Sequence, residues 1–203
     1  MYTTIFVWCF FFFSVYTGSY NIGFLIYNGV SIDEYQKGNF AKEIALVKGI
    51  GKTFNISKNE TNIGIITYSS GASIRLGFGD ISSQAALESS LDAITISGSG
   101  RNIARALLLA QTDLFNQSTS GQINNVLVVL TDGSSDDAVA ASAYALKASG
   151  ISVITIGIGQ YVRGQLNEMA SAPHSDNVFT VTSYSELGTI MGILKDSIVK
   201  GNC

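Results

Sequence analysis

A run of five apolar residues, Val126–Leu130, ends abruptly at Thr131-Asp132-Gly133 and constrains the fold more than any other feature of the chain. Three of the five are valines, and the run is too short to span a membrane. Such a run is typical of a strand buried on both faces, in the middle of a parallel sheet covered by helices. Ligands of open α/β sheets bind at the carboxyl ends of the central strands, so Asp132 is a candidate functional carboxylate. The alternative is that Asp132-Gly133 is only a turn.

Apolar runs and helical stripes alternate along the rest of the chain. Strands are expected at residues 22–27, 63–68, 73–78, 126–131, 152–158 and 177–181. Helices are expected at residues 39–54, 83–94, 102–115, 138–149, 165–170 and 187–198, the last opened by a capping box of Ser183 and Glu186. This order predicts an α/β fold of three layers: a doubly wound, mostly parallel six-stranded sheet with helices on both faces. A hairpin adds one antiparallel edge strand, and the strands at 22–27 and 126–131 should be central neighbours.

The first part of the chain differs in kind from the rest. Residues 5–15 form an eleven-residue apolar run followed by small residues, which is the length of a signal-peptide core. We expect residues 1–19 to be a signal peptide cleaved after Ser19, leaving residues 20–203 as a single domain. No Lys or Arg precedes the run, so a membrane anchor is the alternative. No later stretch could cross a membrane, and the mature protein should be secreted and extracellular.

Composition excludes several classes of partner. Only 13% of residues are charged, the net charge is −3, and no block of Lys or Arg occurs. A nucleic-acid partner or an anionic membrane surface is therefore not expected. Apolar residues make up 46% of the chain, which fits a compact domain.

Cysteines and glycosylation motifs fit an extracellular protein. Cys9 lies in the apolar run and leaves with it, so Cys203 has no partner within the mature chain. An odd cysteine in a secreted protein favours an intermolecular disulfide, here a disulfide-linked dimer or a mixed disulfide. Asn-x-Ser/Thr motifs occur at Asn55, Asn59 and Asn116, all in predicted loops or helix ends where a glycan is tolerated.

No catalytic motif is complete, and the chain is not expected to be an enzyme. The segment at residues 98–103 begins like a dinucleotide fingerprint but lacks the third glycine and a preceding strand. His174 is the sole histidine, and no nucleophile-elbow sequence accompanies it. No Cys/His cluster could hold zinc.

Several segments together resemble a von Willebrand factor type A domain. They are residues 24–26, 63–69, 104–107, 129–133, 154–159 and 184–187. The resemblance covers the whole mature chain and implies an extracellular adhesion or matrix module that binds other proteins, matrix or collagen-like partners among them. A structural matrix component cross-linked through Cys203 is the alternative.

The resemblance also implies where a metal-ion-dependent adhesion site would lie. That site uses an Asp-x-Ser-x-Ser loop, a Thr before the third helix and an Asp after the central strand. The corresponding residues are Tyr27, Gly29, Ser31, Arg101 and Asp132. Three of the five ligands are lost, so we expect a degenerate site without metal.

Magnesium held by Ser31 and Asp132 is the weak alternative, because Mg²⁺ requires near-octahedral oxygen coordination. A register slip that placed Ser99 at the Thr position would add one hydroxyl. Arg101, however, would repel the ion by roughly 4 kcal/mol for each unit-charge pair at about 4 Å and an effective dielectric near 20. We expect its guanidinium instead to pair with Asp132. Ser31 could equally be a loop or capping hydroxyl.

Overall fold

The chain folds around a six-stranded sheet with the strand order β3-β2-β1-β4-β5-β6. The computed structural model describes residues 18–34, 36–57, 59–116 and 123–200. The strands are β1 (Ser19–Tyr27), β2 (Thr61–Tyr68), β3 (Ala72–Leu76), β4 (Ile123–Thr131), β5 (Ser152–Ile158) and β6 (Val178–Val181). Only the β2–β3 edge pair is antiparallel. The predicted mixed sheet is confirmed, as is the central pairing of β1 with β4.

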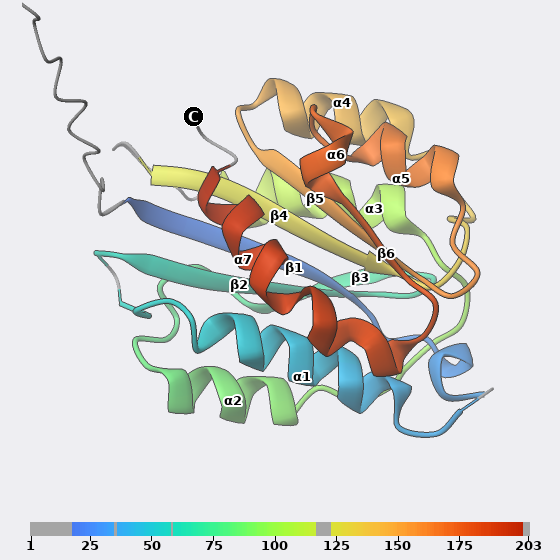
Figure 1. The fold of residues 1–203 in the computed structure, drawn as a ribbon, viewed down its shortest axis with the longest axis horizontal. Helices are drawn as coiled ribbons and strands as arrows, with labels where there is room; N and C mark the ends of the chain where they lie inside the picture. The colour runs from blue at the N-terminus through green and yellow to red at the C-terminus, as the bar shows by residue number, and fades with distance from the viewer. Residues whose placement is uncertain (1–17, 35, 58, 117–122, 201–203) are drawn as a thin grey trace, which may run out of the picture.

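Helices cover both faces of the sheet (Figure 1). On one side lie α1 (Asn39–Gly51), α2 (Gln84–Asp92) and α7 (Met191–Lys200). On the other lie α3 (Ile103–Leu109), α4 (Ala140–Ala148) and α5 (Arg163–Met169). Residues 126–131 of β4 are buried throughout, because both faces of this strand are covered. That coverage explains why the strand has a continuous apolar sequence rather than an alternating one.

Four short elements complete the chain, and they differ from the expected boundaries. They are η1 (Val30–Asp33), the π-helical η2 (Ala110–Leu114), α6 (His174–Asn177) and the 3₁₀ segment η3 (Tyr184–Ile190). The expected third helix thus ends in a π turn and the expected last helix begins as 3₁₀. The expected capping box does not form: Ser183 makes no side-chain cap, and Glu186 accepts from the N–H and hydroxyl of Thr182, the residue before the N-cap. No helix among the described residues is long and apolar enough to span a bilayer.

Strands β1 and β2 share the pattern Asn-Ile-Gly followed by Tyr, and the two copies pair in register. Asn21 lies opposite Asn62, and Tyr27 lies opposite Tyr68. The asparagines form a side-chain ladder across three strands: Asn62 Nδ2 donates to Asn21 Oδ1 at 3.1 Å, and Asn21 Nδ2 donates to Asn125 Oδ1 at 3.0 Å. A one-residue slip would break this ladder, so it helps to fix the register of the central strands.

The two glycines of this pattern create a groove for the end of the third helical segment. A Cβ on Gly64 would lie 2.8 Å from Leu114 Cδ1, and one on Gly23 would lie 3.1 Å from the Phe115 ring. Leu114 therefore packs directly on the strand backbone, and it is only 2% exposed.

Leu114→Ala should lower the free energy of unfolding by about 2–5 kcal/mol, because it empties this groove at the centre of the sheet. Urea unfolding followed by circular dichroism measures the change. Leu108 on α3 is the matched control, since it is 50% exposed. Leu108→Ala should stay within about 0.5 kcal/mol of the parent. Equal losses in the two variants would contradict the packing described.

Candidate functional site

The carboxyl ends of β1 and β4 meet at one edge of the sheet and bring the predicted site residues together. Tyr27 ends β1, Asp132 follows β4, Ser31 lies in η1, and Arg101 precedes α3. Ser31, Arg101 and Asp132 line one cavity of about 570 Å³, with Tyr184 on its wall. The edge expected from the sequence is therefore a real concavity in the folded domain.

Arg101 forms an ion pair with Asp132, as expected. Its Nη2 lies 2.6 Å from Asp132 Oδ1, and the two side chains are 19% and 16% exposed. The guanidinium carbon also lies 4.4 Å from the centre of the Tyr27 ring, a cation–π contact. Burial is the largest single influence and would lower the pKa of Arg101, but Asp132, Tyr27 and Tyr68 together outweigh it and the pKa is raised. The cation is therefore permanent.

The guanidinium is held tightly on more than one side. A Cβ on Gly133 would lie 2.8 Å from Nη1, so a larger residue at this position would push the guanidinium aside. The Nε atom is buried and has no hydrogen-bond partner among the described residues. Arg101 is thus fixed in place by packing and charge rather than by a full set of hydrogen bonds.

The loop after β4 fixes the start of α3. Asp136 accepts a hydrogen bond from the Arg101 backbone N–H, and Ser135 Oγ accepts from Ile103 N–H at 3.0 Å. The two oxygens of Asp137 accept hydrogen bonds from the backbone N–H groups of Ala104 and Arg105, at 2.9 and 3.1 Å. The sequence reasoning missed this role. No sequence signal indicated it, because Asn102 is a favoured N-cap residue. The structure shows that Asn102 supplies no side-chain cap, so the first N–H groups of α3 take acceptors from the loop after β4.

Tyr27 fills space beside Gly29 and Ser31. Its hydroxyl lies 2.7 Å from Ser31 Oγ, so these two groups share a hydrogen bond. A Cβ on Gly29 would lie 2.2 Å from the Tyr27 hydroxyl oxygen and 2.5 Å from Cζ. The aromatic residue at 27 and the glycine at 29 therefore depend on each other.

A buried carboxyl group lies behind the site, and sequence reasoning did not anticipate it. Glu43 of α1 is 1% exposed, and its Oε1 accepts a hydrogen bond from Tyr27 N–H at 3.1 Å. Its Oε2 has no partner among the described residues. Burial raises the pKa of Glu43 well above its ordinary value, and the nearby Asp132 carboxylate adds to the shift.

The other candidate residues lie elsewhere. Ser99 is exposed and is not part of the cavity lining, which leaves Arg101 next to Asp132. Asn55, Asn59 and Asn116 are exposed and precede β2 or β4, at the opposite edge of the sheet. Cys203 and the expected signal-peptide core lie outside the described residues. Within the described ranges, no group of three or more His, Cys, Asp or Glu side chains could hold a metal ion.

Comparisons with known proteins all point to one protein family. The model of the von Willebrand factor type A domain matches residues 21–192. Vitrin of Mus musculus is 28% identical over 169 residues, which is 83% of this chain and 25% of vitrin. Cochlin of Homo sapiens is 26% identical over 91% of this chain and 32% of cochlin. The collagen alpha-1(XXI) chain of Homo sapiens is 29% identical over 73% of this chain and 16% of the collagen chain.

A solved structure gives the same result. Proximal thread matrix protein 1 from the mussel byssus, with zinc in its metal-ion-dependent adhesion site (MIDAS) motif, superimposes on this chain with a TM-score of 0.82 at 25% identity. The match covers 90% of this chain and 46% of the mussel chain. The present chain therefore spans less than half of the mussel protein and a third or less of these curated relatives.

Proposed function

We propose, from the premise that this chain belongs to the von Willebrand factor type A domain family, that it is a secreted, extracellular protein-binding module that acts without a metal ion. The family is not enzymatic, so the chain is not an enzyme, as expected. The partner would be an extracellular or matrix protein, collagen-like proteins included. It would bind at the sheet edge that carries Arg101 and Asp132.

The Arg101–Asp132 ion pair carries the proposal of metal independence. Asp132 is the one carboxylate among the five positions, and its Oδ1 already pairs with a fixed cation at 2.6 Å. Ser31 shares its hydroxyl with Tyr27, and position 29 has no side chain. Mg²⁺ needs six oxygen ligands in near-octahedral geometry, so these residues do not fit that ion. The zinc-occupied motif of the mussel protein contrasts with the guanidinium found here.

The relatives support an extracellular setting. One is a collagen chain, and a similar solved structure is a thread matrix protein. The weak charge of the chain fits a protein partner better than a nucleic acid. Cleavage after Ser19 remains a prediction, and it would remove the first residue of β1.

The test is capture of matrix proteins on the immobilised domain, once with magnesium and once with a chelator. The same proteins should be retained in both, because no metal takes part. Arg101→Ala should abolish capture, whereas Arg105→Ala, an exposed arginine on α3, should leave it unchanged. Circular dichroism confirms that each variant is folded. Capture that requires magnesium would refute metal independence, and capture that survives Arg101→Ala would refute this edge as the binding surface.

The second candidate function is a structural matrix component cross-linked through Cys203, favoured by the single cysteine that would remain after cleavage. Secreted protein should then migrate as a disulfide-linked dimer or mixed disulfide without reductant, because the secretory pathway is oxidising. Cys203→Ser should give monomer only. A monomer in both lanes, together with a freely titratable thiol in the parent, would rule out cross-linking and leave the binding module.

A further inference from the structure

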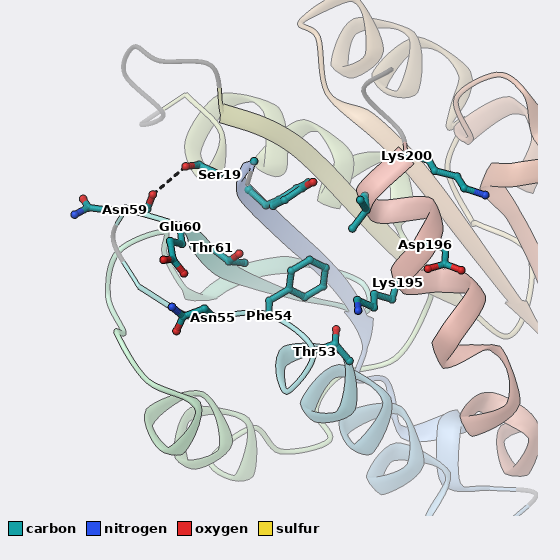
Figure 2. Close-up of a pocket in the computed structure, with 13 residues that line it drawn as sticks. Ser19, Thr53, Phe54, Asn55, Asn59, Glu60, Thr61, Lys195, Asp196 and Lys200 are labelled. Atoms are coloured by element: carbon teal, nitrogen blue, oxygen red, sulfur yellow. Dashed lines mark hydrogen bonds between the residues drawn. The ribbon is translucent and has the colours of Figure 1, made fainter. Parts of the chain in front are cut away.

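A second cavity, of about 580 Å³, opens at the opposite edge of the sheet, where the chain enters β1 and leaves α7. Figure 2 shows Lys195, Asp196 and Lys200 of α7 on one side of it, with Thr53, Asn55, Asn59 and Thr61 on the other. The rings of Tyr20 and Phe54, 5.7 Å apart, both line it. This cleft has no part in the Arg101 site.

Two glycosylation motifs lie on one rim of this cleft. Asn55-Ile56-Ser57 lies in the connection from α1 to β2, Asn59-Glu60-Thr61 runs from that connection into the first residue of β2, and both asparagines are exposed. In Figure 2 the side chains of Asn55 and Asn59 point outward, away from α7. Each amide nitrogen therefore has open solvent in front of it, which a bulky glycan requires.

We propose that Asn55 and Asn59 both carry N-linked glycans that flank this cleft, and that the glycan on Asn59 is attached before β2 pairs with β1. The proposal rests on the proposed extracellular function, because glycans of this kind are added in the secretory pathway. Asparagine Nδ2 attacks C1 of the first sugar of a lipid-linked oligosaccharide diphosphate. The Nδ2–C1 bond forms, the bond from C1 to the diphosphate oxygen breaks, the lipid diphosphate leaves, and one amide proton passes to a base of the transferase.

The timing follows from how the folded domain holds the second motif. Thr61, whose hydroxyl completes the motif, is 3% exposed in β2. The backbone around it is tied to β1: Tyr20 pairs with Thr61, and Tyr20 N–H donates to Glu60 O at 2.7 Å. A transferase that must reach the Thr61 hydroxyl can do so only before this strand is in place. A glycan on Asn59 must therefore be attached while this part of the chain is still unfolded.

The positions of the two asparagines also keep their glycans away from the proposed partner-binding surface. Asn55 and Asn59 lie at the amino ends of the strands, and Arg101 and Asp132 lie at the carboxyl ends. Glycans on the two asparagines would cover the cleft rim and leave the proposed binding edge free. A protein partner would thus meet the domain from the Arg101 side.

The first experiment is translation of the full chain in the presence of microsomes, with gel mobility and mass spectrometry before and after glycan removal by an amidase. Asn55→Gln and Asn59→Gln should each lose one glycan. Ser57→Ala should lose the same glycan as Asn55→Gln, while Ser57→Thr should keep it. Translocated chain in which either asparagine stays unmodified would overturn the proposal.

A second version of the chain, in which a known secretory leader replaces residues 1–19, separates this proposal from the proposed function. Glycans on the leader-driven chain, but none on a native chain that stays outside the microsomes, would support the glycan sites and count against secretion. The timing is tested with folded, sugar-free chain from bacteria added to detergent-opened microsomes. Asn59 should gain no glycan unless the chain is first unfolded in urea and diluted. Equal modification of folded and unfolded chain would overturn the order of events.

Discussion

Gly29→Ser should lower the free energy of unfolding by about 1–3 kcal/mol in the parent chain, and by much less in a chain that also carries Tyr27→Asp. The new Cβ would lie 2.2 Å from the Tyr27 hydroxyl oxygen and 2.8 Å from Cε2, so the ring must move. Moving the ring also disturbs its contact with Arg101. In the double variant the ring is gone and the serine has room.

A double-mutant cycle measures this coupling by urea unfolding of the parent, the two single variants and the double variant. Contacting residues are expected to be non-additive by about 0.5–3 kcal/mol. Gly71→Ser is the matched control, because a Cβ at Gly71 meets no atom within 4 Å. Additive effects of Tyr27→Asp and Gly29→Ser would show that the two positions do not depend on each other.

The same pair of changes, combined with Arg101→Thr, should create magnesium affinity that the parent lacks. The triple variant restores a second carboxylate and two hydroxyls and removes the repelling cation. Calorimetry with MgCl₂ should show binding to the triple variant only. Adding Asp132→Ala to it should abolish binding again. Heat of magnesium binding to the parent would contradict the proposed metal-free site.

The sheet could be predicted from the sequence because burial on two faces leaves a strong signal. The run at 126–130 and the repeated apolar segments indicated all six strands, with boundaries wrong by a few residues at their ends. The β1–β4 pairing followed because only neighbours bring Ser31 and Asp132 to one rim. The π turn at 110–114 and the 3₁₀ turn at 184–190 could not be predicted, because both have the apolar spacing of an ordinary helix.

The site was predictable only where charge dictated the contact. Arg101 and Asp132 were expected to pair because each would otherwise be a lone charge in a half-buried pocket, and they do. Glu43 was missed because it follows Lys42 on a helix, where a glutamate usually faces solvent. Its burial depends on how α1 packs on the end of β1, and local sequence does not encode that packing.

Glu43→Gln should make the domain more stable at neutral and alkaline pH and remove part of the pH dependence of its stability. The pKa of Glu43 is raised in the folded state, chiefly by burial. Between its ordinary value of 4.5 and the folded pKa, the unfolded chain has released this proton and the folded chain has kept it. The unfolded state then binds fewer protons, so stability falls as pH rises, by up to about 1.4 kcal/mol per pH unit.

Glutamine keeps the oxygen that accepts the Tyr27 N–H and has no proton to lose, so it avoids this loss. Urea unfolding of the parent and Glu43→Gln from pH 4 to pH 9, a range of roughly five units, measures the difference. The two stability curves should be close at the acidic end and separate as pH rises. Glu43→Ala removes the acceptor altogether and should cost about 1–3 kcal/mol across the range.

Glu186→Gln provides a control of opposite sign. Hydrogen bonds from the Thr182 hydroxyl and backbone N–H lower the pKa of Glu186. The contribution of Glu186 to stability is present above its pKa in the unfolded chain and is lost as the pH falls through its pKa in the folded chain. The stability of this variant should therefore differ from that of the parent at neutral pH and converge with it in acid. Both variants therefore converge with the parent in acid, but at neutral pH Glu186→Gln should be less stable than the parent and Glu43→Gln more stable. If the free energy of unfolding of Glu43→Gln equals that of the parent at every pH, the Glu43 carboxyl does not keep its proton in the folded state. Water would then reach this carboxyl despite its burial.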